Sequence, residues 1–592
     1  MLRIREPGGS AVSSIVRGAS SRKSRWARTV VVVGAVALLA AACGSSNKSS
    51  TSTSSGSSGT SGSNALTLTN GSTGKGVAGE GPYPWKYPAS GSVALGSGTT
   101  IGGTACTSGT PQFGSPYADP CVAKFTGNNG GATYDGVTAN TIAISRREFP
   151  ETANGQEIAA QAKNEGYALP QVTDQVMNVF LNYFNSVYDL YGRKVVITPV
   201  ASTSNYTAEL LNTNQAQACA DADKIANQMH AFGDIGIGED FQGGGTSVFA
   251  QCAAQQKLMV FDAAAYFNEG YYQQNNPYVW GIAQDCTRIA YNQAEAYSKL
   301  LAGKKAIYAG DATLRTQTRK FGIYVPTLPA YTSCTQQAIA SMEDTFHIPA
   351  AQVSTEFTYG LDISTFQQSA QQAIVQFKAA GVTTIITACD AFSLSLLTKA
   401  AAAQNYHPEW LLNGVAGDDT DSVAQTYNQS EVTGHLFGTS EASPQTEIFG
   451  PNSLAGQLYQ KLTGHQIPAG TDGAYDNLVW MFDALQAAGP DLTPQNVARG
   501  VHALPSLGAP DYTFGKWDLS TNPQGNVGYG DHTMISDARF IYWNGAATSP
   551  DNGKQGTYVP IFSGQRYSVG QWPTQLPTLF TAPGSQDPSC SC

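Results

Sequence analysis

The sequence predicts an α/β protein with two doubly wound parallel-sheet lobes. Strand-like and helix-like segments alternate from about residue 136, and the same alternation starts again after Gly303. A length of 592 residues is more than one hydrophobic core usually holds, and 41% hydrophobic residues are enough for packed cores. The formal net charge of -10, with no dense Lys/Arg block outside the first 28 residues, argues against a nucleic-acid partner.

Residues 1–42 predict a lipoprotein signal peptide. Basic residues precede an apolar run from Val30 to Ala42, which is shorter than the ~20 residues of a membrane-spanning helix. The run ends Ala-Ala-Cys-Gly at Cys43 and resembles a bacterial lipobox, in which the cysteine thiol takes a diacylglycerol. A plain secretory signal with an incidental Cys43 is the alternative. Residues 43–75, rich in Ser, Gly and Thr, predict a disordered tether, so we expect a protein anchored on the extracytoplasmic face of a bacterial membrane.

Lobe 1 is assigned to residues 136–303 and 435–510. Alternating or apolar runs predict its strands, and apolar residues at helical spacing predict its helices. The expected strands are 141–145, 194–198, 235–237, 258–261 and 278–282, and the expected helices are 176–191, 218–229 and 247–256. Two later helices, 474–488 and one that begins at Thr493-Pro494, have no strand between them, so we expect them to return to this lobe.

Lobe 2 is assigned to residues 304–434 and 511–560, and residues 561–592 are expected to form a C-terminal tail. The expected strands are 320–325, 353–357, 383–387 and 410–412, and the expected helices are 334–346, 366–380 and 394–404. This β-α-β order implies a parallel sheet covered on both faces. Residues 76–135, before lobe 1, predict an irregular N-terminal extension.

Nine cysteines follow the lipobox, and in an exported chain most should be oxidised. Cys106 and Cys121 bracket a Gly/Pro-rich stretch of the extension, so a local disulfide is the simplest expectation. Cys334 follows one strand of lobe 2 and Cys389 ends another; adjacent strands would bring them together, although Cys286 is a competing partner. No Cys-X-X-Cys or histidine spacing accompanies the cysteines, which argues against a zinc site.

The sequence shows no complete motif of a catalytic or cofactor site. The seven histidines form no zinc-protease arrangement, and Gly-X-Ser-X-Gly matches lie only in the tether. The segment Gly236–Phe241 half-matches a dinucleotide fingerprint, but Phe241 stands where the third glycine is needed, so a strand-to-helix turn is preferred. We therefore expect no enzyme activity, no cofactor and no metal.

A resemblance to a known family rests on four short segments. They are Gly136-Val137-Thr138, Tyr191-Gly192-Arg193-Lys194 and residues 377–382, each before a strand, and Ala474-Tyr475-Asp476, which opens a late helix. In this order they resemble the extracytoplasmic solute-binding proteins of ABC importers, in the leucine/isoleucine/valine-binding class of type I periplasmic binding proteins. The similarity covers about residues 136–560; the long extension and the lack of an Asp at 201–205 are departures.

The resemblance implies two lobes, joined by three crossovers, that close on a small solute. It also implies ABC permease subunits as partners and a monomeric chain with no reaction of its own. The predicted function is capture of a small polar or amphipathic solute, of the amino-acid-like class, for import. A ligand-binding sensor or an envelope scaffold of the same fold is the alternative.

Candidate solute-binding residues follow the parallel strands, because the carboxyl ends of such strands meet at one cleft. In lobe 1, Thr246 and Ser247 end a glycine-rich loop and would donate hydrogen bonds to a solute carboxylate, with helix capping as the alternative. The resemblance places further contacts at Ala264 and Tyr266, and it puts Asp285 near a solute amino group.

In lobe 2, Asp390 and Phe392 follow one predicted strand, and Asp418 follows another. A solute ammonium group would favour one or two of the candidate carboxylates, and the others would be helix caps or solvated loop charges. The resemblance also implies a Cys219–Cys252 disulfide, because relatives often bridge the two elements that carry these residues.

Overall fold

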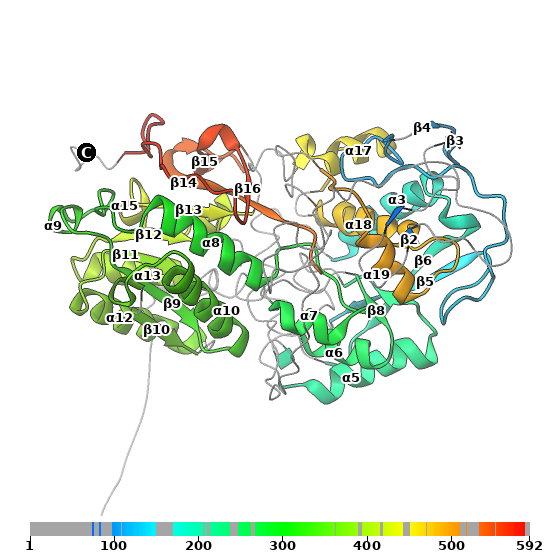
Figure 1. Ribbon diagram of the computed structural model, residues 1–592, viewed down its shortest axis with the longest axis horizontal. Coiled ribbons are helices and arrows are strands. Elements are labelled where there is room, and N and C mark those ends of the chain that lie inside the picture. The colour runs from blue at the N-terminus through cyan, green and yellow to red at the C-terminus, as the bar shows by residue number, and fades with distance from the viewer. Residues whose placement is uncertain are drawn as a thin grey trace, which may run out of the picture.

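A computed structural model gives the fold of most of the chain beyond residue 96 (Figure 1). It describes residues 74–75, 82–83, 97–107, 109–149, 170–204, 208–209, 213–236, 247–261, 267–353, 355–360, 363–388, 393–414, 418–441, 450–468, 471–508, 517, 532–550 and 552–586. The predicted signal peptide, Cys43 and all of the predicted tether except 74–75 lie outside the described residues.

The first sheet is parallel and has the strand order β6-β5-β7-β8. Its strands are β5 (Thr141–Glu148), β6 (Lys194–Ala201), β7 (Gly233–Asp234) and β8 (Met259–Val260). A parallel bridge from Val260 to Val279 adds a fifth position next to β8. In chain order the sheet therefore runs 2-1-3-4-5, which is a doubly wound arrangement with a reversal between β5 and β7.

The second sheet has the strand order β10-β9-β11-β12-β13-β14-β15. The first five are parallel and the last two are antiparallel additions. They are β9 (Phe321–Pro326), β10 (Thr355–Tyr359), β11 (Thr384–Thr387), β12 (Glu409–Leu412), β13 (Leu436–Ser440), β14 (Asp537–Thr548) and β15 (Gln555–Pro560). The parallel part again runs 2-1-3-4-5, with its reversal between β9 and β11, so the predicted α/β class with two parallel sheets is confirmed.

Helices cover both faces of the first sheet. The long helix α3 carries Val176, Phe180 and Phe184 at helical spacing, and these pack in one core with the late helices. Helices α5 and α6 contribute Ala222 and Phe249 to a separate core on the other side. The helices of this part are α3 (Pro170–Val187), α5 (Gln215–Asp223), α6 (Ser247–Gln255), α7 (Glu269–Asn275), α17 (Leu454–Thr463), α18 (Gly473–Ala487) and α19 (Pro494–Val501).

The second sheet is covered by two helix pairs, since α8 packs against α10 and α12 packs against α13. Right-handed crossovers place helices on opposite faces when the chain reverses direction across a sheet, as it does between β10 and β11. The helices of this part are α8 (Cys286–Leu300), α9 (Ala312–Arg315), α10 (Pro329–Ala340), α11 (Ala350–Val353), α12 (Ile363–Ala379), α13 (Ser393–Ala403), α14 (Asp421–Ala424) and α15 (Gln429–Val432).

The chain passes between the two lobes three times, and the three passages are bonded to one another. Gln284, just before α8, donates from its backbone N–H to Glu441 Oε2 at 2.9 Å and from its side chain to the carbonyl of Asp537 at 2.6 Å. Glu441 follows β13 and Asp537 begins β14. These hydrogen bonds place the three crossings side by side.

The positions of these crossings correct three expected boundaries. Helix α8 packs on α10 of lobe 2, although residues up to 303 were assigned to lobe 1. Strand β13 pairs with β12 in the second sheet, although lobe 1 was expected to resume at 435. The expected tail is also part of lobe 2, because β16 (Tyr567–Ser568) pairs with β14 and Trp572 and Phe580 are buried in its core. Side chains from distant parts of the sequence complete the core of lobe 2, and local sequence patterns do not reveal such long-range packing.

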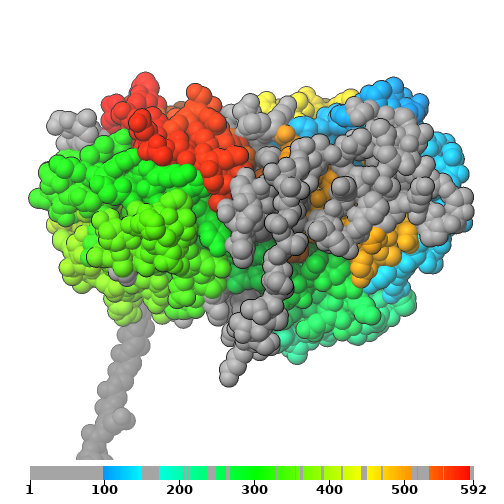
Figure 2. All heavy atoms as spheres, viewed as in Figure 1, coloured from blue at the N-terminus to red at the C-terminus, as the bar shows by residue number. Residues whose placement is uncertain are grey.

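The described part of the N-terminal extension packs on lobe 1. Strands β3 (Ser97–Thr99) and β4 (Ala105–Thr107) form a short hairpin, and the following loop buries Phe113 and Tyr117 in the core of α3 and α18. Figure 2 shows this segment, in blue, at the end of lobe 1 that is remote from lobe 2. The short pair β1 (Gly74–Lys75) and β2 (Pro82–Tyr83) precedes it in the chain.

Three disulfides join described residues. Cys106–Cys121 and Cys219–Cys252 are as predicted. The expected Cys334–Cys389 pair is wrong, because Cys334 is bonded to Cys286. The reason is helix packing: Cys286 begins α8 and Cys334 lies on α10, and these two helices lie against each other. Cys389 lies outside the described residues.

Within the described ranges, no helix combines the length and the apolar character that crossing a bilayer requires.

Candidate functional site

The carboxyl ends of the parallel strands are where a doubly wound fold offers a ligand site. In both sheets the strand order reverses once, between β5 and β7 and between β9 and β11. Five of the predicted solute-binding residues lie in segments that follow these strands but fall outside the described residues: Thr246, Ala264, Tyr266, Asp390 and Phe392. Ser247 is the first residue of α6, and its side chain is also outside the description.

One pocket opens among the described residues at the carboxyl ends of β11 and β12. Its cavity volume is about 40 Å³. Helix α8 contributes Cys286, Ile289, Ala290 and Gln293, helix α10 contributes Tyr331, Cys334, Thr335 and Ala338, and Ala388 and Asn413 follow the two strands. None of these lining side chains is an acid or a base, so the wall is apolar with a few hydrogen-bonding groups.

The pocket wall is held together covalently and by hydrogen bonds. The Cys286–Cys334 disulfide joins the two helices that form its sides. Gln293 Nε2 donates to the carbonyl of Asn413 at 3.0 Å, which ties α8 to the end of β12. Because these contacts link three separate elements, the shape of the pocket is fixed by tertiary structure.

Asp285 lies next to the pocket but is fully engaged in the fold. It is the N-cap of α8, and its Oδ1 accepts from the Arg288 backbone N–H at 2.9 Å. Its Oδ2 accepts from Thr533 Oγ1 at 3.2 Å, and the side chain is 0% exposed. Burial raises the pKa of Asp285, although Arg288 and Thr533 favour its ionised form. The Asp285 carboxylate therefore links the first crossing, which precedes α8, to Thr533 of the third crossing.

Asp418 is the other predicted carboxylate that the structure describes. It is buried, and its Oδ2 accepts a long hydrogen bond from the backbone N–H of Asn413, a residue of the pocket wall, at 3.4 Å. Its carbonyl accepts from the Tyr558 hydroxyl at 2.7 Å. Burial raises the pKa of Tyr558 well above its ordinary value, and nearby Tyr427 and Asp418 add to the shift. Asp285 thus precedes the lining residue Cys286 in the chain and Asp418 is bonded to the lining residue Asn413, but neither carboxylate lines the pocket.

A buried ion network at the end of β5 was not predicted. Arg147 donates to Glu209 at 2.5 and 3.0 Å and to Asp221 at 2.6 and 2.9 Å, and its guanidinium lies over the rings of Phe149 and Phe249. Burial by itself would raise the pKa of Asp221, but Arg147 and neighbouring hydroxyl donors hold it below its usual range. The Arg147 guanidinium is paired with two buried carboxylates of the same lobe, so we assign the network a structural role. The run of charged residues at the end of a buried strand is the signal that could have indicated it.

A second network of hydrogen bonds, which the sequence did not predict, links the segments that pass between the lobes. Arg288 donates from Nη1 to the carbonyls of Thr533 and Ile535 at 3.0 and 2.6 Å. Arg566 donates from Nε to Asp537 Oδ1 at 2.8 Å and from Nη2 to the carbonyl of Glu441. Two arginine side chains of lobe 2 thus bind the segments in which the chain passes between the lobes, which is where a rotation of the lobes would have its axis.

These features define a two-lobed α/β protein with doubly wound sheets, three crossings and a pocket beside them. No protein-family model and no curated protein matches the sequence. Among solved structures, the chain is similar to an ABC transporter substrate-binding protein from Aeropyrum pernix, with 15% identity and a TM-score of 0.47 over 73% of this chain and 96% of that one.

Two further solved structures illustrate the range of solutes that similar proteins carry. The branched-chain amino acid substrate-binding protein LivJ from Streptococcus pneumoniae, in complex with isoleucine, is 14% identical, with a TM-score of 0.44 over 71% of this chain and 100% of that one. A fatty acid ABC transporter substrate-binding protein from Thermomonospora curvata is 12% identical, with a TM-score of 0.47 over 75% of this chain and 97% of that one. The structural neighbours are thus ABC transporter substrate-binding proteins, some of them of the leucine/isoleucine/valine-binding class.

Proposed function

We propose that this chain is a lipid-anchored solute-binding protein that captures a small polar or amphipathic solute, of the amino-acid-like class, for an ABC permease. The observation that carries the proposal is the position of the pocket. It lies at the carboxyl ends of two parallel strands, and Cys286 in its wall directly follows the first crossing between the lobes. The described wall belongs to lobe 2, and a solute seated there would stabilise a closed form by also touching lobe 1 when the lobes close.

The chemistry of the pocket wall supports an amphipathic solute. Ile289, Ala290 and Ala338 supply apolar surface, and the amides of Gln293 and Asn413 supply hydrogen-bonding groups. The apolar part of a solute would pack against α8 and α10, and its polar end would face the strand ends, where Asp418 lies. Asp285 is a weaker candidate for the ammonium partner than the sequence indicates, because its oxygens accept hydrogen bonds from Arg288 and Thr533.

The anchor and the permease partner rest on the sequence. The apolar run, the lipobox-like end at Cys43 and the Ser-rich segment after it support attachment to the outer face of the membrane. A captured solute at that face needs a membrane transporter to enter the cell. The resemblance to components of ABC importers supports an ABC permease as this transporter. A monomer suffices for this task.

The direct test identifies the solute. The protein is purified without added ligands and denatured, and the released small molecules are identified by mass spectrometry. Candidates, beginning with the L-amino acids, their amides and small aromatic acids, are then titrated by calorimetry. A single amphipathic compound that binds in the micromolar range or tighter supports the proposal, and the absence of binding by every class contradicts it.

Two alanines of α10 provide a matched pair for locating the site. Ala338 lines the pocket, whereas Ala340 is exposed on the same helix and does not. Ala338→Leu should fill the pocket and weaken the identified solute at least tenfold, which corresponds to about 1.4 kcal/mol. Ala340→Leu should leave the affinity within twofold. Equal affinities for the two variants would show that the solute binds elsewhere.

Uptake assays separate delivery from sensing. If the gene is deleted, loss of uptake of the identified solute supports the permease partner. Unchanged uptake, together with a lost transcriptional response to the solute, would favour a sensor of the same fold.

A further inference from the structure

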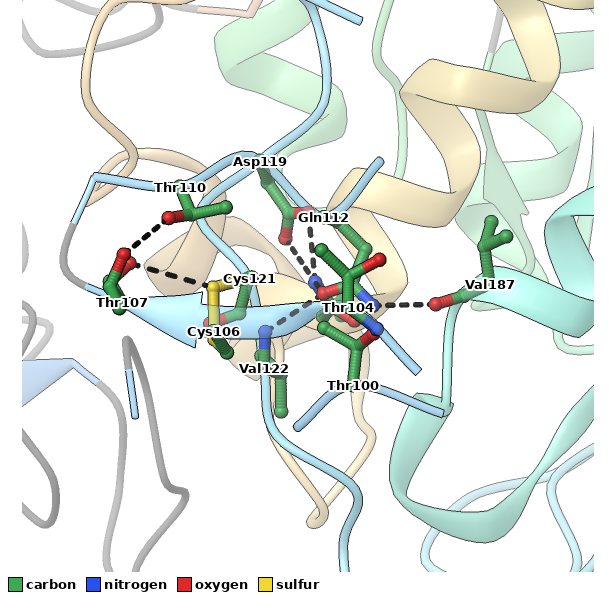
Figure 3. Close-up of a disulfide and its surroundings, with 11 residues drawn as sticks. Thr100, Thr104, Cys106, Thr107, Thr110, Gln112, Asp119, Cys121, Val122 and Val187 are labelled. Atoms are coloured by element: carbon green, nitrogen blue, oxygen red, sulfur yellow. Dashed lines mark hydrogen bonds between the residues drawn. A yellow bond between two sulfur atoms is a disulfide. The ribbon is translucent and has the colours of Figure 1, made fainter. Parts of the chain in front are cut away.

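The N-terminal extension is fastened to lobe 1 as a strap, which we define as residues 97–125. The Cys106–Cys121 disulfide closes a loop within it, as Figure 3 shows, and Gln112 Nε2 donates to the carbonyl of Val187 at the end of α3 at 2.5 Å. At the end of the strap, the backbone N–H of Phe125 donates to Asp189 Oδ2 at 2.6 Å. The strap is therefore an ordered layer on the lobe surface.

Two buried carboxyl groups meet where the strap contacts α18. Asp119 of the strap is 0% exposed and Asp483 of α18 is 1% exposed. The backbone N–H of Asp119 donates to Asp483 Oδ1 at 3.1 Å, so the two acidic residues are bonded directly to each other. Gln486 Nε2 donates to both carboxyl oxygens of Asp119 at 2.8 and 2.9 Å. The pair is thus shared between the strap and the lobe.

Neutral groups surround the pair on every element packed against it. Tyr188, after α3, donates its hydroxyl to Asp483 Oδ1 at 2.5 Å, and Tyr475 of α18 also interacts with Asp483. Asp483 Oδ2 is buried and accepts no hydrogen bond from the described residues. No Lys, Arg or His is among the described groups that act on either carboxyl.

Two carboxylates in contact, buried and without a cation, cannot both be ionised. Burial and the neighbouring Asp483 raise the pKa of Asp119 well above its ordinary value. Burial raises the pKa of Asp483 to about 7, although the Tyr188 hydroxyl favours its ionised form.

We propose that Asp119 and Asp483 share a proton that fastens the strap to lobe 1, so that the strap loosens as the pH rises. When the strap leaves, both carboxyls become solvated and return to ordinary pKa values near 4. The docked form therefore holds more protons than the released form between about pH 4 and 7, and its stability falls across that window.

Release of the strap would increase the distance between the lobes and the point to which the N-terminus is attached. The Cys106–Cys121 bond shortens the released strap to about 14 free residues, which as a flexible coil span roughly 20 Å. An acidic medium would keep the lobes close to the attachment point, and a neutral or alkaline one would let them extend. This device is independent of the proposed solute site, since the strap lies on the part of lobe 1 remote from lobe 2 (Figure 2).

Hydrogen exchange of the whole processed chain, detected by mass spectrometry from pH 5 to 8, tests the proposal. Protection factors, corrected for the intrinsic exchange rate at each pH, are followed for peptides that cover residues 105–125, and peptides from β12 serve as an internal reference. Each proton held in excess by the docked form should lower the protection of the strap about tenfold per pH unit.

Three isosteric substitutions complete the experiment. Asp483→Asn and Asp119→Asn keep the shape of the pair but leave a single titratable group, so each should flatten the pH dependence of strap protection. Asp223→Asn removes an exposed carboxylate from α5 of the same lobe and should keep the wild-type slope. Strap protection that does not change between pH 5 and 8, or a wild-type slope in both pair variants, would overturn the proposal.

Discussion

Replacing Asp285 by alanine should destabilise the fold by about 2–4 kcal/mol. The side chain caps α8 through Arg288 N–H at 2.9 Å, and the loss of an N-cap costs about 1 kcal/mol. Thr533 Oγ1, which donates to Asp285 Oδ2 at 3.2 Å in a buried site, also loses its acceptor, and such a loss costs about 1–3 kcal/mol. Urea unfolding followed by circular dichroism at neutral pH measures the sum.

Asp285→Asn is the matched control for this prediction. Asparagine is as good an N-cap as aspartate, and its amide NH2 can donate to the Thr533 hydroxyl, which then accepts, so we expect the variant to lie within about 1 kcal/mol of the wild type. Because burial raises the folded-state pKa of Asp285, the wild type loses stability relative to this variant as the pH rises from about 4 through that pKa. Wild-type stability for Asp285→Ala, or an equal loss in both variants, would refute this account of Asp285.

The other predictions concern the anchor, a disulfide and a buried ion pair. Cys43→Ala should move the protein from the detergent phase to the soluble or precursor fraction, because an acyl chain contributes about 0.8 kcal/mol per buried CH₂; unchanged fractionation would exclude the anchor. Replacing Cys286 and Cys334 together by serine opens a loop of 48 residues and should cost about 4 kcal/mol in urea unfolding. Non-reducing peptide mapping should show these two cysteines linked, and a bond to another cysteine would contradict the helix packing. Arg319→Met leaves Glu409, bonded to it at 2.7 and 2.8 Å, buried without its cation and should cost about 3–5 kcal/mol, whereas a loss below 1 kcal/mol would show that the pair is hydrated.

The sequence predicted most strands of the two parallel sheets and the helices between them, but not α8, β13 or β14. The apolar run 383–387 lies in β11 and the preceding residue, and Phe180 and Phe184 lie one turn apart on α3, as their spacing predicts. These features are local, because a strand or helix records its buried face in the few residues that form it. The alternation of such elements was enough to predict two parallel sheets.

Only the tertiary structure decided how distant segments meet. The second hydrogen bond of the Asp285 carboxylate comes from Thr533, 248 positions away, and the environment of Asp119 depends on Asp483, 364 positions away. Cys334 bonds to Cys286 because α8 and α10 pack together, although adjacent strands had suggested Cys389. The pocket is likewise made by two helices and two strand ends. A carboxylate or a thiol carries no local signal of its partner, because burial and hydrogen bonding arise when separate elements pack, and these contacts fix its charge and its role.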